Sequence, residues 1–279
     1  MCILEEDQKK QLLEKGYFIL KNFLGESEIE IFHESFLKKK NKQNYLEYND
    51  ENFWKYITNK NLLKTLKNLL GEKFYYMHDL SINETRIENN FRSWHRDSPC
   101  RATGIGPDWD KNFPYNVVST ITYLSSSKET NSHLNVIIGS HKHQYKFTIS
   151  NILRFIHRKI YYIQTLRFLT FLIEKIIGTK LTFNSGDCVI FLANIYHMGS
   201  GITPTNKTRK FILARYGGEG KHSENYLNFF LKHRHENLNR FEKFEKKKEY
   251  FDFLIKNKIF IPPPEYKKEI KGVYSNLKK

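Results

Sequence analysis

Residues 184–197 read Asn-Ser-Gly-Asp-Cys-Val-Ile-Phe-Leu-Ala-Asn-Ile-Tyr-His and contain a turn, an apolar run and a polar end. Residues 184–187 are typical of a tight turn, because Gly and Asn tolerate the left-handed backbone that turns require. The apolar run at residues 188–193 predicts a short strand. His197 follows this strand almost directly, so we expect an imidazole where the strand leaves the core.

A second polar element lies much earlier in the chain, at residues 93–98, which read Ser-Trp-His-Arg-Asp-Ser. Residues i and i+2 of a strand project from the same face, so His95 and Asp97 can present an imidazole and a carboxylate to one point. An isolated His-x-Asp is common by chance. Together with His197, however, it forms the two-histidine, one-carboxylate set that leaves open positions on Fe(II). Zinc would accept the same three ligands with a water in the fourth position.

A strand predicted at residues 209–216 carries the residue that decides between these metals. Arg209 opens this strand, twelve residues after His197. An Fe(II) oxygenase that uses 2-oxoglutarate must neutralise the cosubstrate carboxylate that lies away from the metal, and a guanidinium offers the bidentate fork that fits it. Strand alternation puts Arg215 on the same face, which makes it the second candidate. Either arginine would also be an ordinary surface residue if taken alone.

The order of the motifs resembles that of the phytanoyl-CoA dioxygenase superfamily, over roughly residues 16–216. The shared motifs are His95-Arg96-Asp97, the stretch 131–141 that ends in Gly-Ser-His, Gly186-Asp187, the stretch 197–201 and Arg209. The resemblance implies a double-stranded β-helix (jelly roll, cupin-like). It also implies that His95, Asp97 and His197 bind iron and that Arg209 anchors 2-oxoglutarate. The chain departs from the superfamily pattern at Ile138, where Pro is frequent, and in the longer segment 202–208 before Arg209.

The resemblance also implies a reaction class. The superfamily contains non-haem Fe(II)/2-oxoglutarate oxygenases, which consume O2 and release succinate and CO2. Relatives that halogenate have Gly or Ala at the carboxylate position, so Asp97 implies hydroxylation, desaturation, epoxidation or ring closure at an aliphatic C–H. The expected substrate is a small or lipid-like metabolite, and the basic chain would suit an anionic one. The alternative is a non-catalytic jelly-roll module that binds an anionic polymer or membrane surface through its basic face.

Several other residues are weaker candidates for the site. Thr120, Thr122 and Asn83 lie in predicted strands and offer polar groups for contacts with 2-oxoglutarate, although Thr is also simply a good strand former. Trp94 and Trp109 are candidates for the wall of the pocket. Structural roles are expected for the histidines His78, His133, His141 and His143.

The surrounding pattern predicts one domain, residues 1–279, that is mainly β with flanking helices. Helical patterns at residues 3–15, 26–42 and 61–70 precede a series of short strands, which is typical of helices packed on a β-sandwich or barrel. The jelly-roll core is expected at about residues 72–216. A helical insertion at about 145–178 interrupts it, and a basic helical extension at about 221–279 follows it.

The charge of the chain is unevenly distributed. Lys and Arg number 46 against 30 Asp and Glu, and the whole surplus lies after residue 140. This asymmetry indicates an anionic partner on one side of the molecule. The basic and apolar insertion at 145–178 predicts peripheral contact with an anionic membrane, or else packing on the core or on a second copy. Nucleic acid is not expected, since no recognition module accompanies the charge.

The cysteine and hydropathy patterns bear on location. Cys2, Cys100 and Cys188 are too few and too widely spaced for a disulfide framework or a metal knuckle. Acidic residues occupy the N-terminal region where a secretory signal needs an apolar core, and no run of about 18 uncharged apolar residues occurs. We therefore expect a cytoplasmic protein that is a monomer or a homodimer.

Overall fold

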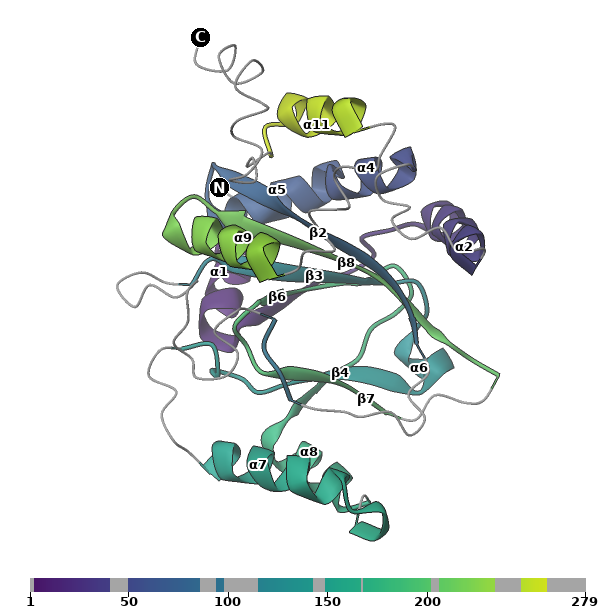
Figure 1. Cartoon of the computed structure of the whole chain (residues 1–279), viewed down its shortest axis with the longest axis vertical. Coiled ribbons are helices and arrows are strands. Elements are labelled where there is room, and N and C mark those ends of the chain that lie inside the picture. Colours follow the sequence, from purple (N-terminus) through teal and green to yellow (C-terminus); the bar gives the residue numbers. More distant parts are fainter. Residues whose placement is uncertain are drawn as a thin grey trace.

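The computed structural model describes residues 3–40, 50–85, 94–97, 115–142, 149–166, 168–201, 206–233 and 247–259 (Figure 1). The strands are β1 (Tyr17–Leu20), β2 (Phe74–Thr85), β3 (Val117–Tyr123), β4 (Ser132–Val136), β5 (Thr179–Leu181), β6 (Cys188–Leu192), β7 (His197–Gly201) and β8 (Arg209–Gly218). The α-helices are α1 (Ile3–Lys15), α2 (Glu26–Lys40), α4 (Glu51–Ile57), α5 (Lys60–Leu70), α6 (Ser127–Thr130), α7 (Ile149–Tyr161), α8 (Leu169–Ile177), α9 (Lys221–His233) and α11 (Lys247–Lys256). A short 3-10 helix, η1 (Gln164–Leu166), joins α7 to α8.

The strands form two antiparallel sheets that face each other. The large sheet has the order β1-β6-β3-β8-β2, and the small sheet has the order β5-β4-β7. Apolar side chains from both sheets, among them Tyr123, Phe191 and Leu134, fill the space between them. This arrangement is a jelly-roll core with flanking helices, so the predicted fold class is confirmed.

Helices cover the outer face of the large sheet (Figure 1). Phe53 of α4, Leu62 of α5 and Leu254 of α11 are fully buried in one cluster with strand residues such as Ile190 and Ile212. Local sequence fixes where two of these helices begin. Asp50 accepts a hydrogen bond from the main-chain N–H of Asn52, and Asn59 caps α5 in the same way.

Strand alternation divides the residues of β8 between the two sides of the large sheet. Ile212 and Ala214 face the outer helices, whereas Phe211 and Leu213 pack into the space between the sheets. Because side chains alternate along a strand, Arg209 and Arg215 also face this interior. Both arginines that the sequence singled out are therefore on the side of the sheet that lines the jelly roll.

Between β4 and β5 the chain forms α7, η1 and α8, which we call the insertion and which pack against the outer face of the small sheet (Figure 1). Ile177 of α8 contacts a small apolar cluster that contains Trp94 and Met198. Glu174, which is 4% exposed, accepts a hydrogen bond from Ser200 of β7 and lies 3.3 Å from His157 of α7. This buried polar group attaches both insertion helices to the sheet.

Two further points concern the helices. Within the described ranges, no helix has both the length and the apolar character needed to cross a bilayer. After β8 the described residues form α9 and α11, while residues 234–246 and 260–279 lie outside the described residues.

Candidate metal centre

The fold brings the three predicted metal ligands together. The Oδ1 atom of Asp97 lies 3.8 Å from Nε2 of His95 and 3.6 Å from Nε2 of His197. One ligand atom from each of the three residues lies within 4.8 Å of the others. Two ligands of one metal at bond lengths of about 2.0–2.2 Å are at most about 4.4 Å apart, so a small contraction would complete a coordination sphere.

Main-chain hydrogen bonds hold the two histidines side by side. His95 and His197 form an isolated antiparallel bridge, in which N–H groups donate to carbonyls over 3.0 and 2.9 Å. Their ring centroids are 4.3 Å apart. The side chain of His197 is 6% exposed, whereas that of His95 is 42% exposed, so one ligand is buried and the other borders solvent.

The orientation of His197 suits metal binding. Its Nδ1 lies 3.2 Å from the carbonyl oxygen of Ile195, which can accept the ring proton and leave Nε2 directed towards Asp97. Burial, together with the nearby His95, lowers the pKa of His197 to about 4, although Asp97 and the hydrogen bond with the Ile195 carbonyl oppose the shift. The imidazole is therefore neutral near pH 7, which is the form that binds metals.

The second carboxylate oxygen of Asp97, Oδ2, is held by neighbouring side chains. It accepts a hydrogen bond from Ser119 Oγ at 3.0 Å and lies 2.9 Å from Nη2 of Arg215. Arg215 also donates to Ser119 and forms an ion pair with Asp79 of β2. These contacts leave Oδ1 to face the two histidines, so the chain orients the carboxylate without using the oxygen that would bind metal.

A bulge in β2 brings Asp79 to this cluster. Tyr76 pairs with Tyr216 and Leu80 pairs with Ala214, so residues 77–79 lie opposite Arg215 alone. His78 adopts a φ of 52°, a left-handed conformation that is uncommon for residues other than Gly. Bulges of this kind are frequent beside functional sites, where they redirect one side chain.

Ser119 gives a test of this carboxylate support. Replacing Ser119 with alanine should weaken ferrous iron binding about 10-fold, because Asp97 loses one of the two groups that orient it. Anaerobic titration with Fe(II) would measure the affinity. Thr120→Val is the matched control. Thr120 is the next residue of β3, its side chain lies on the opposite face of the strand, and its hydroxyl donates to the Ala214 carbonyl. Equal iron affinity of Ser119→Ala and wild type would contradict this role.

Arg209 is a buried guanidinium that lies close to the same strand as His197. It is 9% exposed, and a Cβ added at Gly199 of β7 would lie 2.8 Å from its Nη1. Burial lowers the pKa of Arg209, while the nearby Tyr123 opposes this effect. Within the described part of the chain, no carboxylate pairs with Arg209, and its buried Nε has no hydrogen-bond partner. A buried cation of this kind fits an anionic ligand.

Among the described residues, Arg215, unlike Arg209, already has carboxylate partners. Its guanidinium is already engaged by Asp79 and Asp97, so of the two predicted anchors only Arg209 remains available for a ligand carboxylate. Asn83 faces the interior from β2, where it pairs in register with Phe211 and donates a hydrogen bond to Ser81. Its assignment to 2-oxoglutarate stays a prediction.

The positions of Thr120 and Thr122 correct the prediction for these residues. Both side chains lie on the outer face of β3, where the Thr122 hydroxyl is 2.8 Å from the Tyr56 hydroxyl of α4 and Thr120 bonds to the Ala214 carbonyl. Neither faces the metal ligands. The residue of β3 that does is Ser119, between Val118 and Thr120.

The remaining sequence candidates have structural roles or lie outside the described residues. Trp94 packs on the outer side of the small sheet beside Gly178, away from the interior. Nε2 of His141 lies 2.9 Å from the carbonyl oxygen of Leu13, as expected of a structural histidine. Trp109 and His143 lie outside the described residues.

The Gly-Ser-His motif links the two segments that contain the predicted metal ligands. The Ser140 hydroxyl accepts from the N–H of Tyr196, and the Ser140 carbonyl accepts from the buried Arg96 guanidinium. Arg96 also lies 4.1 Å above the Tyr196 ring. Since Arg96 and Tyr196 each adjoin a predicted ligand, Ser140 fixes the spacing of the two segments.

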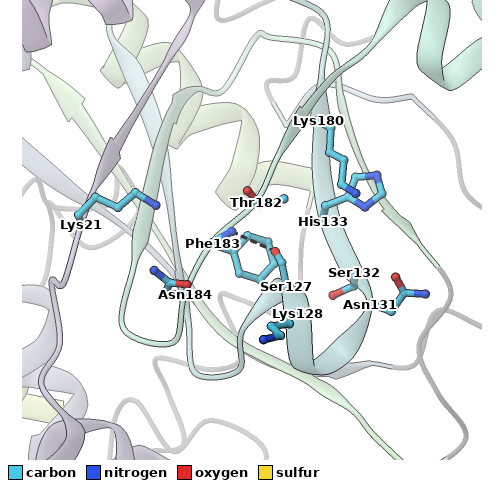
Figure 2. Close-up of a pocket in the computed structure, with 10 residues that line it drawn as sticks. All are labelled: Lys21, Ser127, Lys128, Asn131, Ser132, His133, Lys180, Thr182, Phe183 and Asn184. Atoms are coloured by element: carbon cyan, nitrogen blue, oxygen red, sulfur yellow. Dashed lines mark hydrogen bonds between the residues drawn. The ribbon is translucent and has the colours of Figure 1, made fainter.

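A separate pocket of about 520 Å³ lies apart from the three predicted metal ligands (Figure 2). Lys128, Lys180 and His133 line it, together with Lys21, which is paired with buried Asp187 at 2.8 Å. Phe183 also lines the pocket and stacks on Tyr123. Neither the three metal ligands nor Arg209 belongs to this lining, so the pocket is distinct from the candidate metal centre.

Comparisons with known proteins support the fold through structure alone. No protein-family model matches the sequence, and no curated protein is significantly similar to it. HygX from Streptomyces hygroscopicus with iron bound is similar over 76% of this chain and 86% of that one, with 16% identity and a TM-score of 0.56. The epimerase SnoN in complex with Fe3+, alpha ketoglutarate and nogalamycin RO covers 77% and 84%, with 12% identity and a TM-score of 0.53. The carbocyclase SnoK, a non-heme alpha ketoglutarate dependent enzyme from nogalamycin biosynthesis, covers 76% and 83%, with 13% identity and a TM-score of 0.51. At these identities the likeness establishes that the chain shares the fold of these enzymes.

Proposed function

We propose that this protein is an Fe(II)/2-oxoglutarate-dependent oxygenase of the phytanoyl-CoA dioxygenase type. The observation that carries the proposal is the convergence of His95, Asp97 and His197 at one point, with the buried Arg209 close by. Iron and 2-oxoglutarate occur in solved structures of proteins with this fold, which supports the same ligands here.

The donor set suits iron. Two imidazoles and one carboxylate match the facial set of non-haem Fe(II) oxygenases, which leaves positions for a cosubstrate and O2. When bound together, iron and 2-oxoglutarate supply the oxidative chemistry, in which O2 is consumed, 2-oxoglutarate becomes succinate and CO2, and a C–H bond is oxidised.

The residues of the chain would position the cosubstrate and neutralise its carboxylate. His197 and Gly199 share the inner face of β7, and the Arg209 guanidinium lies against Gly199, about 7 Å along the strand from the ligand position. A five-carbon dicarboxylate can bridge this separation between the metal and Arg209. Ser119 and Arg215 keep Asp97 in its orientation, and the apolar interior excludes water from the cosubstrate end.

The reaction on the substrate is proposed to be oxidation of an aliphatic C–H, with hydroxylation as the simplest outcome. The proposed substrate is a small or lipid-like metabolite. Solved proteins of this fold include an epimerase and a carbocyclase, so the fold supports several oxidative outcomes. The open side of the site, next to the half-exposed His95, is where the substrate would enter.

Anaerobic reconstitution tests the proposal directly. Adding Fe(II) and 2-oxoglutarate together should produce a weak visible charge-transfer band, because the keto acid chelates iron through its open positions. Zn(II) in place of Fe(II) is the control, since a d10 ion gives no such band. The absence of a band at saturating ligand would contradict the proposal and favour a non-catalytic jelly-roll module, which would also produce no succinate in air.

A further inference from the structure

The insertion carries an unusual amount of exposed apolar surface. Among the described residues, the large apolar side chains that are more than half exposed all belong to it, apart from Leu37 of α2. We call these residues, together with the exposed cations between them, the insertion face. Its apolar members are Ile149, Phe155, Tyr162, Phe168, Leu172 and Ile176, which are 53–75% exposed.

Helical spacing gives each insertion helix two apolar sides. Phe168, Leu172 and Ile176 follow one another at intervals of four residues, so they form a single outward stripe along α8. Ile173 lies on the opposite side of α8 and is buried. On α7, Tyr161 is buried towards the core while Phe155 is 61% exposed. A helix that only packed on the small sheet would need the inner side alone.

The exposed charges of the insertion face are all positive. Arg158, Lys159 and Lys175 are exposed, and Lys159 lies 5.4 Å from the centre of the Phe155 ring. The sequence from 145 to 178 contains one acid, Glu174, which is buried and held by His157 and Ser200. The outward side of α7 and α8 therefore combines aromatic and aliphatic side chains with cations and carries no exposed acid among its described residues.

We propose that the insertion face docks on the surface of an anionic lipid bilayer. Side chains such as Phe168 and Ile176 would enter the boundary between headgroups and acyl chains, and the neighbouring cations would contact lipid phosphates. Figure 1 shows α7 and α8 at one end of the molecule, beyond the small sheet. The proposal goes beyond the oxidative function and does not depend on it.

The charge pattern disfavours a second copy of the chain as the occupant. A two-fold dimer through this face would bring Arg158, Lys159 and Lys175 of both copies to one interface. Like charges placed together without acids to pair them oppose association. An anionic bilayer supplies the missing negative charge as well as an apolar interior.

Vesicle co-sedimentation of the full chain tests the proposal. Phosphatidylcholine vesicles that contain about one-third phosphatidylserine should bind the protein at least about 10-fold more tightly than pure phosphatidylcholine vesicles. Exchange of Arg158 and Lys159 for Glu should weaken binding to the anionic vesicles about 30-fold or more, since each cation near the surface contributes about fivefold. The matched control is Lys9→Glu with Lys10→Glu in α1, which makes the same change in net charge on exposed residues elsewhere.

A second matched pair of variants tests the contribution of apolar side chains to vesicle binding. Leu172→Ser should weaken binding about fivefold or more, whereas Leu37→Ser should leave it unchanged, although the two leucines are similarly exposed at 53% and 58%. Circular dichroism melting would check that all variants fold. Three results would overturn the proposal: equal binding to both vesicle types, equal effects of the two charge-reversal pairs, or a dimer in sedimentation that Leu172→Ser dissociates while vesicles fail to bind.

Discussion

Asp97→Ala should abolish iron-dependent turnover and weaken Fe(II) binding by more than about 100-fold. Loss of a group that only supports a ligand typically weakens metal binding 10–100-fold, and Asp97 would be a ligand itself. Its removal also takes a carboxylate away from Arg215, which is buried and would retain Asp79 as its ion-pair partner. Fe(II) titration under anaerobic conditions and succinate formation in air would measure the two effects.

A second ligand variant separates metal loss from misfolding. The side chain of His95 is 42% exposed, so His95→Ala should disturb the core little and still remove one of the three donors. We expect its iron affinity to fall as far as that of Asp97→Ala while its melting temperature stays near that of wild type. His133→Ala is the control, because His133 lies in the separate pocket and should retain iron. Normal iron binding by a folded His95→Ala variant would contradict the proposed ligand set.

Arg209→Ala should raise the KM for 2-oxoglutarate at least about 30-fold. Truncating one partner of a buried charge pair costs about 2–5 kcal/mol, and the lower end of that range corresponds to this factor. Iron affinity in the absence of 2-oxoglutarate should not change, because Arg209 lies against Gly199 and contacts none of the three ligands. Initial rates of succinate formation at varied 2-oxoglutarate would give the KM.

Two other variants make the assignment of Arg209 specific. Gly199→Ala should raise the same KM by a smaller factor, since its new methyl group would lie 2.8 Å from Nη1 of Arg209 and displace the guanidinium. Arg215→Lys should behave in the opposite way, with weaker iron binding and little change in KM, because Arg215 holds Asp97. A raised KM in Arg215→Lys with none in Arg209→Ala would reverse the assignment.

The sequence was sufficient to predict the fold class and the convergence of the three ligands. The His-x-Asp pair and the strand that ends near His197 are local patterns, and the order of the motifs indicated how they meet. The face of β3 was harder to predict, because all seven of its residues are buried and hydropathy does not distinguish its two sides. For this reason the sequence favours the strand-forming Thr120 and Thr122 and gives no signal for Ser119, between Val118 and Thr120.

Other parts of the site depend on tertiary structure that leaves little trace in the sequence. The bulge that brings Asp79 to Arg215 follows from the left-handed backbone of His78, which is not a residue type that signals a turn. Strand β7 contains two glycines in five residues and was not predicted, since its formation depends on pairing with β4. Helix α4 was also missed, because it has only seven residues and is stabilised mainly by burial of its aromatic side chains.

The main-chain bridge between His95 and His197 has a consequence for how the protein would exchange its metal. Hydrogen bonds of the fold itself set the separation of the two imidazoles, so little of the free energy of iron binding is needed to order the chain. Thermodynamic linkage gives a stabilisation of the folded chain by iron of about 2.7 kcal/mol at a free concentration 100 times the Kd. Loading and release of iron would thus proceed on a folded scaffold, and folding would not have to wait for the metal.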